Sequence, residues 1–327
     1  MNTAKFDILA IGNAIVDVLS ICDDELVDRL NMRKGTMFLI DEARAEELYR
    51  LMGPAKEVSG GAAANTLAGM ASLGAKAAFV GKVRDDQLGK IFTHDMRATG
   101  VHFETACAMT GPATARCLIF VTPDAQRTMN TYIGACARID DSDIDEQLVK
   151  DSTLTFVEGY MWNDPSSKSA IRKAMKIGQQ AGRQIAFSPS DVFCIENHHA
   201  EMLELVGSSD VVFANEEEVK TLYGKSTFDE AREAIRSKCK VAVLTRGEQG
   251  SVVVTANETV AVPAAPIGRL VDTTGAGDLY ASGFLYGYLR GWSHKESAEL
   301  ASRCAAEVIQ HMGARVQKPL SDLVKAA

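Results

Sequence analysis

Residues 272–291 read DTTGAGDLYASGFLYGYLRG, and this stretch decides which fold the chain can adopt. It begins with a turn that contains two glycines and continues with the small and apolar residues typical of a buried helix. Gly275 and Gly277 permit backbone conformations that other residues avoid, and they let a ligand approach the chain closely. A helix that begins at such a turn directs free N–H groups and its positive dipole end toward that ligand. The stretch therefore predicts an anion-binding turn suited to phosphate.

Asp278 stands at the start of this helix, beside the predicted anion site. A resting phosphate would repel a carboxylate there, so the residue needs a different purpose. A base that takes a proton from an attacking hydroxyl group is one such purpose. The alternative is an ordinary N-capping aspartate after a glycine turn, and a glycine pattern this short does not decide between the two.

Short runs of β-branched and aliphatic residues alternate with helical patterns along most of the chain. The expected strands are residues 6–11, 77–80, 154–157, 184–187, 211–214, 241–245 and 251–255. The expected helices are residues 62–73, 87–99, 166–181, 198–206, 229–238 and 277–289. Such alternation predicts an α/β fold with a mainly parallel sheet covered on both faces. In these sheets, ligands bind beyond the carboxyl ends of the strands.

Two segments, residues 15–40 and 105–133, have a different pattern. Each contains strand-like runs with no long helix between them, such as ARCLIFVT and RTMNTYI in the second segment. Such runs are typical of hairpins or edge strands. The two segments are therefore expected to form a small second sheet inserted into the main fold.

Polar residues follow the first expected strand, in the sequence GNAIVD at residues 12–17. Asn13 and Asp17 lie where the chain leaves the main sheet. A carboxylate can accept two hydrogen bonds from a vicinal diol, and an asparagine can donate or accept beside it. Turn chemistry, in which both side chains bond their own backbone, is the alternative.

A glycine pair precedes the expected helix at residues 62–73, in the sequence VSGGAAAN. Gly60 and Gly61 can bring backbone N–H groups against a ligand or act as a hinge. Asn65 lies near the helix start, where its amide can hydrogen-bond a hydroxyl group. Close packing explains the small residues later in the helix, but it does not explain the two glycines followed by Asn65.

The composition is that of a globular protein, and it narrows the class of partner. The chain has 327 residues, of which 46% are hydrophobic, and a formal net charge of -8. A nucleic-acid binder usually has a basic surplus, so none is expected, although a local site can still bind an anion. The seven cysteines are odd in number and lack C-x-x-C spacing, which favours reduced thiols in the cytoplasm. No signal peptide or membrane-spanning stretch is expected.

Taken together, these segments make the chain similar to the PfkB (ribokinase-like) family of carbohydrate and nucleoside kinases. DTTGAGD with its helix, and SGGAAAN with the later GKVRDDQLG, resemble the two signature segments of that family. NEEE at residues 215–218 resembles its N-x-x-E motif, and TRGEQG at residues 245–250 resembles its T-x-G-x-x-G nucleotide segment. The matches occur in the family's order and extend over nearly the whole chain.

The resemblance implies a three-layer α/β/α ribokinase-like fold with a small β-sheet lid over the acceptor. Residues 1–14, 41–104 and 134–327 would form the large nucleotide-binding domain, and residues 15–40 and 105–133 the lid. It also implies ATP and Mg²⁺ as cofactors and a small-molecule acceptor. A monomer or a homodimer is expected, since lid edges can pair between subunits.

The resemblance also implies roles for single residues. Asp278 would be the catalytic base, and its backbone amide would form an anion hole with those of Gly275, Ala276 and Gly277. The residues implied at the acceptor site are Asn13, Asp17, Gly60, Gly61 and Asn65. Those implied around ATP are Asn215 and Glu218, which would organise Mg²⁺ and phosphates through water, and Thr245, Gly247 and Gly250. Those implied for a monovalent cation such as K⁺ are Asp272 and Thr274.

Within the family, the N-x-x-x-D spacing at residues 13–17 is more similar to adenosine kinases than to ribokinases. DAQRTMNTYIGA at residues 124–135 also resembles the adenosine-kinase lid segment. Arg127 would then reach the transferring phosphoryl group and stabilise its oxygens. The alternative for Arg127 is an exposed hairpin residue. The implied reaction is transfer of the ATP γ-phosphate to the 5′-hydroxyl of adenosine.

An adenine ring needs an apolar or aromatic slot. The candidates for its walls are Met37, Phe38, Tyr160, Met161 and Trp162, although most residues of these types lie in a protein core. The sequence EGYMW at residues 158–162 matches only loosely where adenosine kinases have an aromatic pair. A sugar acceptor such as ribose or fructose, or another nucleoside such as inosine, therefore stays open.

Other classes of protein fit the sequence less well. GKST at residues 224–227 lacks the glycine that a Walker A loop needs five positions earlier, so a loop between helices is expected there. The dinucleotide fingerprint G-x-G-x-x-G fails after the first strand and again at Gly275, and the six histidines lack metal-ligand spacing. A non-catalytic nucleoside-binding module is the remaining alternative, and the presence of Asp278 argues against it.

Overall fold

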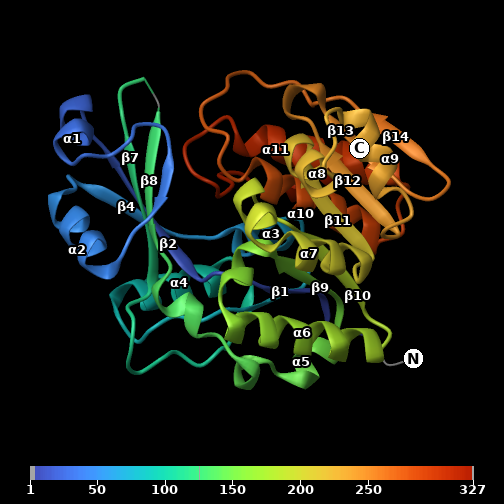
Figure 1. Ribbon diagram of the computed structural model, residues 1–327, viewed down its shortest axis with the longest axis horizontal. Coiled ribbons are helices and arrows are strands. Elements are labelled where there is room, and N and C mark those ends of the chain that lie inside the picture. Colours follow the sequence, from blue (N-terminus) through green and yellow to red (C-terminus); the bar gives the residue numbers. More distant parts are fainter. Residues whose placement is uncertain (1–3, 125, 326–327) are drawn as a thin grey trace.

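The computed structural model describes residues 4–124 and 126–325, which form two β-sheets of unequal size with helices around them (Figure 1). The expected α/β fold, with a large and mainly parallel sheet and a second, smaller sheet, is confirmed. No helix in the described part of the chain is long and apolar enough to cross a membrane.

The large sheet has nine strands among the described residues. In spatial order they are β14 (Thr259–Val262), β13 (Ser251–Val254), β12 (Val241–Thr245), β11 (Val211–Asn215), β10 (Gln184–Ser188), β9 (Ser152–Glu158), β1 (Phe6–Ile11), β5 (Ala77–Val80) and β6 (His102–Phe103). The strands from β6 to β12 are parallel, and β13 and β14 continue the sheet as an antiparallel edge. The carboxyl ends of β1 and β9 to β12 therefore lie along one edge, where ligands bind in such sheets.

Helices cover both faces of the large sheet, because successive strand residues point to opposite sides. Ile8 and Ala10 of β1 pack into one apolar cluster, and Leu9 and Ile11 pack into another. The helices on the first side are α3 (Ala62–Ser72), α4 (Gln87–Ala98), α10 (Ala276–Leu289) and α11 (His294–Val308). Those on the second side are α5 (Glu146–Lys150), α6 (Pro165–Gln180), α7 (Val192–Gly207), α8 (Glu216–Tyr223) and α9 (Phe228–Ile235). The result is the expected three-layer arrangement.

Two details of these helices bear on the sequence predictions. α7 begins six residues before the predicted start at residue 198, since Asp191 caps it by accepting a hydrogen bond from the Phe193 N–H. A kink at His198, with φ -135°, divides it. Residues 224–227 connect α8 to α9, which confirms that GKST is a loop between helices.

The small sheet has the order β3 (Met37–Leu39), β8 (Arg127–Tyr132), β7 (Ala115–Val121), β2 (Ile15–Ile21) and β4 (Ala55–Gly60). Two helices accompany it, α1 (Asp24–Arg29) and α2 (Glu42–Leu51), and Figure 1 shows them on its outer side. The sequence prediction placed residues 41–104 in the large part, which is wrong for β4, because β4 pairs antiparallel with β2. Its sequence, AKEVSG, has no apolar alternation, so only pairing with β2 makes it a strand.

Short elements complete the described chain. They are the 3₁₀ turns η1 (Gly134–Arg138), η2 (Asp141–Asp143), η3 (Gly159–Asn163) and η4 (Gly247–Gln249), and helix α12 (Ser321–Lys325). η3 directly follows β9 and η4 directly follows β12 and Arg246, so both stand at the edge where the strands end.

Candidate active site

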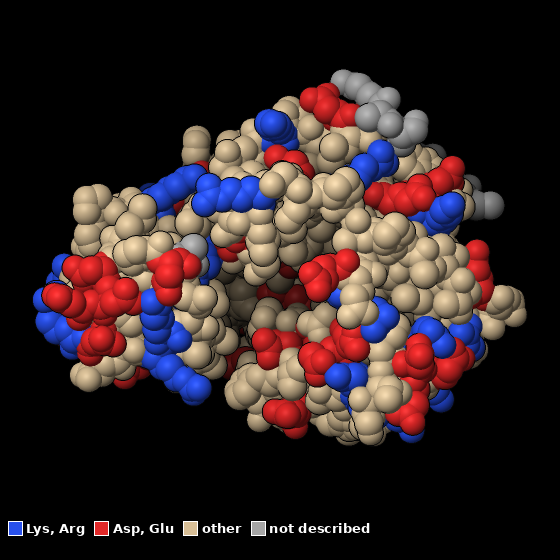
Figure 2. All heavy atoms as spheres, turned by 90° about the horizontal axis from the view of Figure 1, so that it is seen from above, with Lys and Arg blue, Asp and Glu red and all other residues tan. Residues whose placement is uncertain are grey.

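A cavity of about 670 Å³ lies between the small sheet and the carboxyl ends of the large-sheet strands. Figure 2 shows the corresponding hollow between the smaller lobe and the rest of the molecule, with acidic side chains inside it. This volume is in the range of small-molecule sites. The sequence-predicted residues on its wall are Asn13, Asp17, Met37, Gly61, Asn65, Tyr160, Asn215, Glu218, Thr245, Gly247, Thr274, Gly275, Gly277 and Asp278.

Other predicted residues do not line this cavity. They are Phe38, Gly60, Arg127, Met161, Trp162, Gly250, Asp272 and Ala276. Met161 and Trp162 are core residues, with 3% and 0% of their surface exposed, so they are wrong as adenine contacts. Phe38 is wrong as well, because alternate residues of β3 face opposite sides and Met37 and Leu39 take the cavity side. Gly250 permits the turn before β13, where a side chain would overlap the Val262 carbonyl.

The glycine turn and the start of α10 have free backbone N–H groups that are able to bind an anion. Gly275 has φ +79°, a left-handed conformation that suits glycine, and it is the N-cap of α10. Within the described residues, no protein group accepts a hydrogen bond from the backbone N–H of Gly275, Gly277 or Asp278. The Ala276 N–H already donates to the Thr273 carbonyl. Three of the four predicted amide donors are therefore available to an anion.

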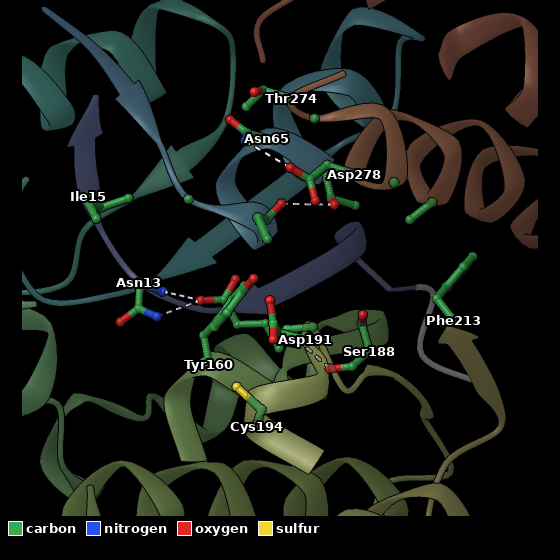
Figure 3. Close-up of a pocket in the computed structure, with 18 of the residues that line it drawn as sticks. Asn13, Ile15, Asn65, Tyr160, Ser188, Asp191, Cys194, Phe213, Thr274 and Asp278 are labelled. Carbon is green, nitrogen blue, oxygen red and sulfur yellow. Dashed lines mark hydrogen bonds between the residues drawn. The ribbon is translucent and has the colours of Figure 1, made fainter. Parts of the chain in front are cut away.

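Asp278 is joined to the opposite wall by Asn65, whose Nδ2 donates to Asp278 Oδ2 at 2.9 Å (Figure 3). Burial raises the pKa of Asp278 to about 6, against the opposing effects of Asn65 and Arg315. A base with a pKa just below neutral is largely ionised at pH 7 and still accepts a proton. The Oδ1 of Asn65 is buried without a partner among the described residues, so it can accept a hydrogen bond from a ligand hydroxyl.

Asp17 extends from β2 toward the same space and lies over Gly60, whose missing side chain leaves room for the carboxylate. In the described part of the chain, no protein group donates a hydrogen bond to this carboxylate. Burial raises the pKa of Asp17 to about 6, and Arg315 and Arg127 oppose that increase. An unpaired carboxylate on a pocket wall can accept the hydroxyls of a diol.

Glu158 is a site residue that the sequence analysis did not identify. It ends β9, is 1% exposed, and accepts hydrogen bonds from the Asn13 N–H at 2.7 Å, Asn13 Nδ2 at 3.0 Å and the Ala63 N–H at 2.7 Å. Burial raises the pKa of Glu158 to about 7. One carboxylate thus fixes both Asn13 and the first turn of α3. A charged residue at the carboxyl end of a buried strand was the one feature of the sequence that could have identified Glu158.

Glu158→Gln tests this anchoring role. An amide has one acceptor oxygen, so its NH₂ group would face one of the three N–H donors. We expect the free energy of unfolding at pH 8 to fall by about 1.5–3 kcal/mol, the range for hydrogen bonds to charged groups. Urea denaturation measures this change. The surface variant Glu146→Gln, which loses only an exposed ion pair with Lys150, should be as stable as the parent within experimental error. Equal stability of Glu158→Gln and the parent at pH 8 would contradict the anchoring role.

Asn215 and Glu218 form a reciprocal capping box at the start of α8. The Glu218 N–H donates to Asn215 Oδ1 at 2.9 Å, and the Asn215 N–H donates to Glu218 Oε2 at 2.9 Å. The motif therefore stabilises the helix end while it lines the cavity. Burial, with a further effect of nearby Asp191, raises the pKa of Glu218 to about 7. Asp191 also lines the cavity, although the sequence analysis did not predict it as a site residue.

Arg127 connects the small sheet to the loop before α10. Its Nη2 lies 2.6 Å from Asp272 Oδ2, and its Nη1 donates to Thr274 Oγ1. Asp272 also accepts hydrogen bonds from the N–H groups of Thr274 at 3.0 Å and Gly313 at 2.7 Å. The two residues expected at a monovalent-cation site thus contact a guanidinium, which supplies positive charge next to the anion turn.

The cavity wall contributed by the small sheet is largely apolar. Met37 and Leu39 of β3 and Met129 of β8 face the cavity. Across from them, η3 and α7 contribute Tyr160 and Phe193, which are 36% and 52% exposed. Large aromatic side chains left this exposed in a pocket provide a surface for a flat ring. Phe193 was not among the predicted residues, because nothing in its local sequence marks it as different from a core residue.

Comparison with known proteins finds similarity along most of the chain. Residues 37–320 match the pfkB family carbohydrate kinases. The crystal structure of adenosine kinase from Sinorhizobium meliloti is 49% identical, with a TM-score of 0.93, and the match covers 99% of this chain and 100% of that one. A probable sugar kinase protein from Rhizobium etli CFN 42 is 46% identical, with a TM-score of 0.93, and the match covers 99% of each chain. A 5-dehydro-2-deoxygluconokinase of Clostridium perfringens is 27% identical over 282 residues, which are 81% of this chain and 82% of that protein.

Proposed function

The chain belongs to the pfkB family of carbohydrate kinases, and from this membership we propose that it transfers the γ-phosphoryl group of ATP to the 5′-hydroxyl of adenosine. The family assignment confirms the resemblance found in the sequence. The choice of acceptor is our own inference. The inference that the acceptor is a nucleoside rests on one observation in the site, which is the apolar and aromatic slot beside the polar residues of the cavity.

The cavity combines two surfaces that suit the two halves of a nucleoside. Asp17, Asn13 and Asn65 present polar groups that can bind sugar hydroxyls. Tyr160 and Phe193 face the same space and would contact the base, with the apolar side chains of the small sheet above it. A simple sugar would leave these aromatic side chains without a partner, so the slot favours a nucleoside.

Adenosine is the nucleoside that we choose, because the Sinorhizobium meliloti structure is that of an adenosine kinase and shares 49% of its residues with this chain. The N-x-x-x-D spacing at residues 13–17 supports the same choice. The relative that acts on 5-dehydro-2-deoxygluconate is much less similar, at 27% identity. A sugar acceptor is therefore the main alternative that an assay has to distinguish.

In the proposed mechanism, the γ-phosphate lies at the Gly275–Asp278 turn. The free amides of Gly275, Gly277 and Asp278 stabilise the charge on the transferring group. Asp278 accepts the proton of the 5′-hydroxyl as that oxygen attacks the phosphorus in line. Asn65 orients the Asp278 carboxylate through its 2.9 Å hydrogen bond.

The ATP half of the site also suits a hydrated Mg²⁺. Glu218 and Asp191 both line the cavity, and a nearby divalent cation would lower the raised pKa of Glu218. Asn215 and Glu218 would hold the ion through water, and the ion would neutralise phosphate charge. Thr245 and Gly247, at the end of β12 and the start of η4, border the space proposed for the nucleotide.

The small sheet is proposed to close over the acceptor and exclude water, which prevents hydrolysis of ATP. Arg127 would then exchange its contact with Asp272 for one with the transferring phosphoryl group. The Arg127–Asp272 ion pair already places the guanidinium beside the anion turn.

The test of this function is ADP release with Mg²⁺–ATP and single acceptors, namely adenosine, inosine, guanosine, cytidine, ribose, fructose and 5-dehydro-2-deoxygluconate. Turnover with adenosine at least tenfold above the others is expected. Preference for a sugar would overturn the acceptor while leaving the kinase assignment in place. Calorimetric binding of adenosine without turnover would instead support a binding module.

Phe193→Ala tests the aromatic slot. Loss of stacking on a base costs about 1–3 kcal/mol, so we expect KM for adenosine to rise about 5- to 150-fold with a smaller change in KM for ATP. Steady-state kinetics at saturating ATP measure the effect. Leu51→Ala is a matched control, because Leu51 is a similarly exposed apolar side chain, at 47%, that does not line the cavity. An unchanged KM for adenosine would remove Phe193 from the acceptor site.

A further inference from the structure

Arg315 lies in the loop between α11 and α12, and no motif in the sequence includes it. Its side chain does not line the cavity, but its charge acts on Asp17 and Asp278, which do. Nε donates to the Ser59 carbonyl at 2.9 Å, Nη2 donates to Ser59 Oγ at 3.0 Å, and Nη1 donates to the Ala64 carbonyl at 2.9 Å. One guanidinium thus joins the C-terminal loop to β4 and to α3.

The acceptors of Arg315 lie on both sides of the glycine pair. Ser59 precedes Gly60 and Gly61, and Ala64 follows them in the first turn of α3. Gly61 has φ +91°, and a side chain there would overlap the Asn13 carbonyl, so this turn fits tightly against its neighbour. Since Asn65 directly follows Ala64, the position of the turn sets where the Asn65 amide meets Asp278.

Arg315 also faces the two carboxylates of the acceptor site. Asp17 and Asp278 both interact with its charge, as does Asp95 of α4. Burial lowers the pKa of Arg315 to about 10, so the side chain is still a cation at neutral pH. The other titratable groups that face Asp17 or Asp278 are Arg127 on β8, Cys117 on β7, Glu158 on β9, Tyr160 on η3 and Asp272 before α10.

We propose that Arg315 is a positioning residue for phosphoryl transfer, which holds the Gly60–Gly61 turn against the C-terminal loop and supplies the positive charge that faces Asp17 and Asp278. The proposal rests on the kinase function proposed above. Arg315 touches neither substrate in this view. It acts through Asn65, which orients the base, and through its charge, which favours the ionised carboxylates.

Two substitutions separate the geometric part of this role from the electrostatic part. Arg315→Lys keeps the charge, but a single ammonium cannot reproduce the fork that contacts Ser59 and Ala64. Arg315→Met keeps the length and removes the charge. We expect kcat to fall about tenfold or more in both variants, because Asn65 and Asp278 lose their alignment. The pH at which turnover falls to half on the acid side should be about one pH unit higher in Arg315→Met than in the parent. In Arg315→Lys this pH should be unchanged.

A second readout needs no acceptor and therefore does not depend on the proposed function. The pKa values of Asp17 and Asp278, about 6 in the folded protein, lie above their ordinary value of 3.8, so folding stability falls as pH rises between these values. Removal of the Arg315 charge should raise the pKa values of Asp17 and Asp278. The loss of folding stability with rising pH should then continue to a higher pH than in the parent. We expect the Tm difference between Arg315→Met and the parent to be larger at pH 8 than at pH 5.5.

Arg116→Met is the control for loss of a buried guanidinium. Arg116 lies in β7, has 7% of its side chain exposed, and pairs with Glu46 of α2 rather than with a cavity residue. Its Tm deficit should be the same at both pH values, and its acid limb should not move. Arg315→Met could instead behave like Arg116→Met, with a Tm deficit that is the same at both pH values and a pH–rate profile that is not shifted. In that case Arg315 has only a structural role and the proposal is wrong. If no acceptor is phosphorylated by the parent, the proposed function fails, and the Tm comparison still decides the role of Arg315.

Discussion

Turnover of the Asp278→Asn enzyme is expected to fall about 10²- to 10⁴-fold, while KM for the acceptor changes little. The amide is nearly the same size as the carboxylate, so the fold and the polar contacts of the pocket are kept. It cannot take the proton of the attacking hydroxyl. The hydrogen bond from Asn65 Nδ2 can still be accepted by the amide oxygen, so the loss reports proton transfer rather than misplacement.

The pH dependence gives a second test of Asp278. The pKa values of Asp17 and Asp278 are both about 6, so the parent should lose activity as the pH falls below that value and both carboxylates are protonated. In Asp278→Asn, the residual turnover should depend less steeply on pH. Asp85→Asn, which changes an exposed carboxylate outside the cavity, is the control and should match the parent. Turnover of Asp278→Asn within a few-fold of the parent would rule out its role as base.

Gly277→Ala is expected to lower turnover about 10²-fold and to raise KM for ATP, without a loss of stability. No atom lies within 4 Å of the place where the new methyl group would stand, and Gly277 does not have a positive φ. The helix therefore accepts alanine without strain. The methyl group would instead occupy open space at the anion turn, where we place the γ-phosphate, and displace the reacting atoms.

Two other glycines show whether this result is specific. Gly207→Ala in α7 has the same open surroundings and the same permitted backbone, but lies outside the cavity, so its activity should equal that of the parent. Gly275→Ala should lose stability, because Gly275 has φ +79° and a side chain there would meet Ala314 Cβ at 2.8 Å. Steady-state kinetics and thermal melting separate these outcomes. Parent-like turnover of Gly277→Ala would mean that the phosphate does not approach this turn.

The fold was largely predictable because its strands and glycine turns are local signals. The strand at Phe6–Ile11 and the helix from Ala276 follow from β-branched runs and from glycines before small apolar residues. β4 escaped prediction because its polar sequence becomes a strand only through pairing with β2. A strand defined by its neighbour has no pattern of its own.

The site was predictable where a motif is local and not where residues meet across the fold. Asp278, Asn65 and Asp17 belong to recognisable segments, and the structure brings all three to one cavity. Glu158 and Arg315 act through contacts with residues that are distant in the chain, and Ala63 and Ser59 lie far from them in sequence. The N-x-x-E pattern at residues 215–218 was recognised as a family motif, but the sequence analysis did not predict that it forms a capping box.

Because of the order of strands along the large sheet, the residues proposed to bind the acceptor and those proposed to bind ATP come from different parts of the chain. The proposed acceptor side uses residues 13–65 and the small sheet together with Tyr160 and Phe193, and the proposed ATP side uses residues 215–247. The turn at residues 274–278 stands between them. Substitutions that reshape the first set leave the second set untouched, so acceptor preference can diverge during evolution while the phosphate chemistry is inherited unchanged. One scaffold can in this way give rise to kinases named for different sugars and nucleosides.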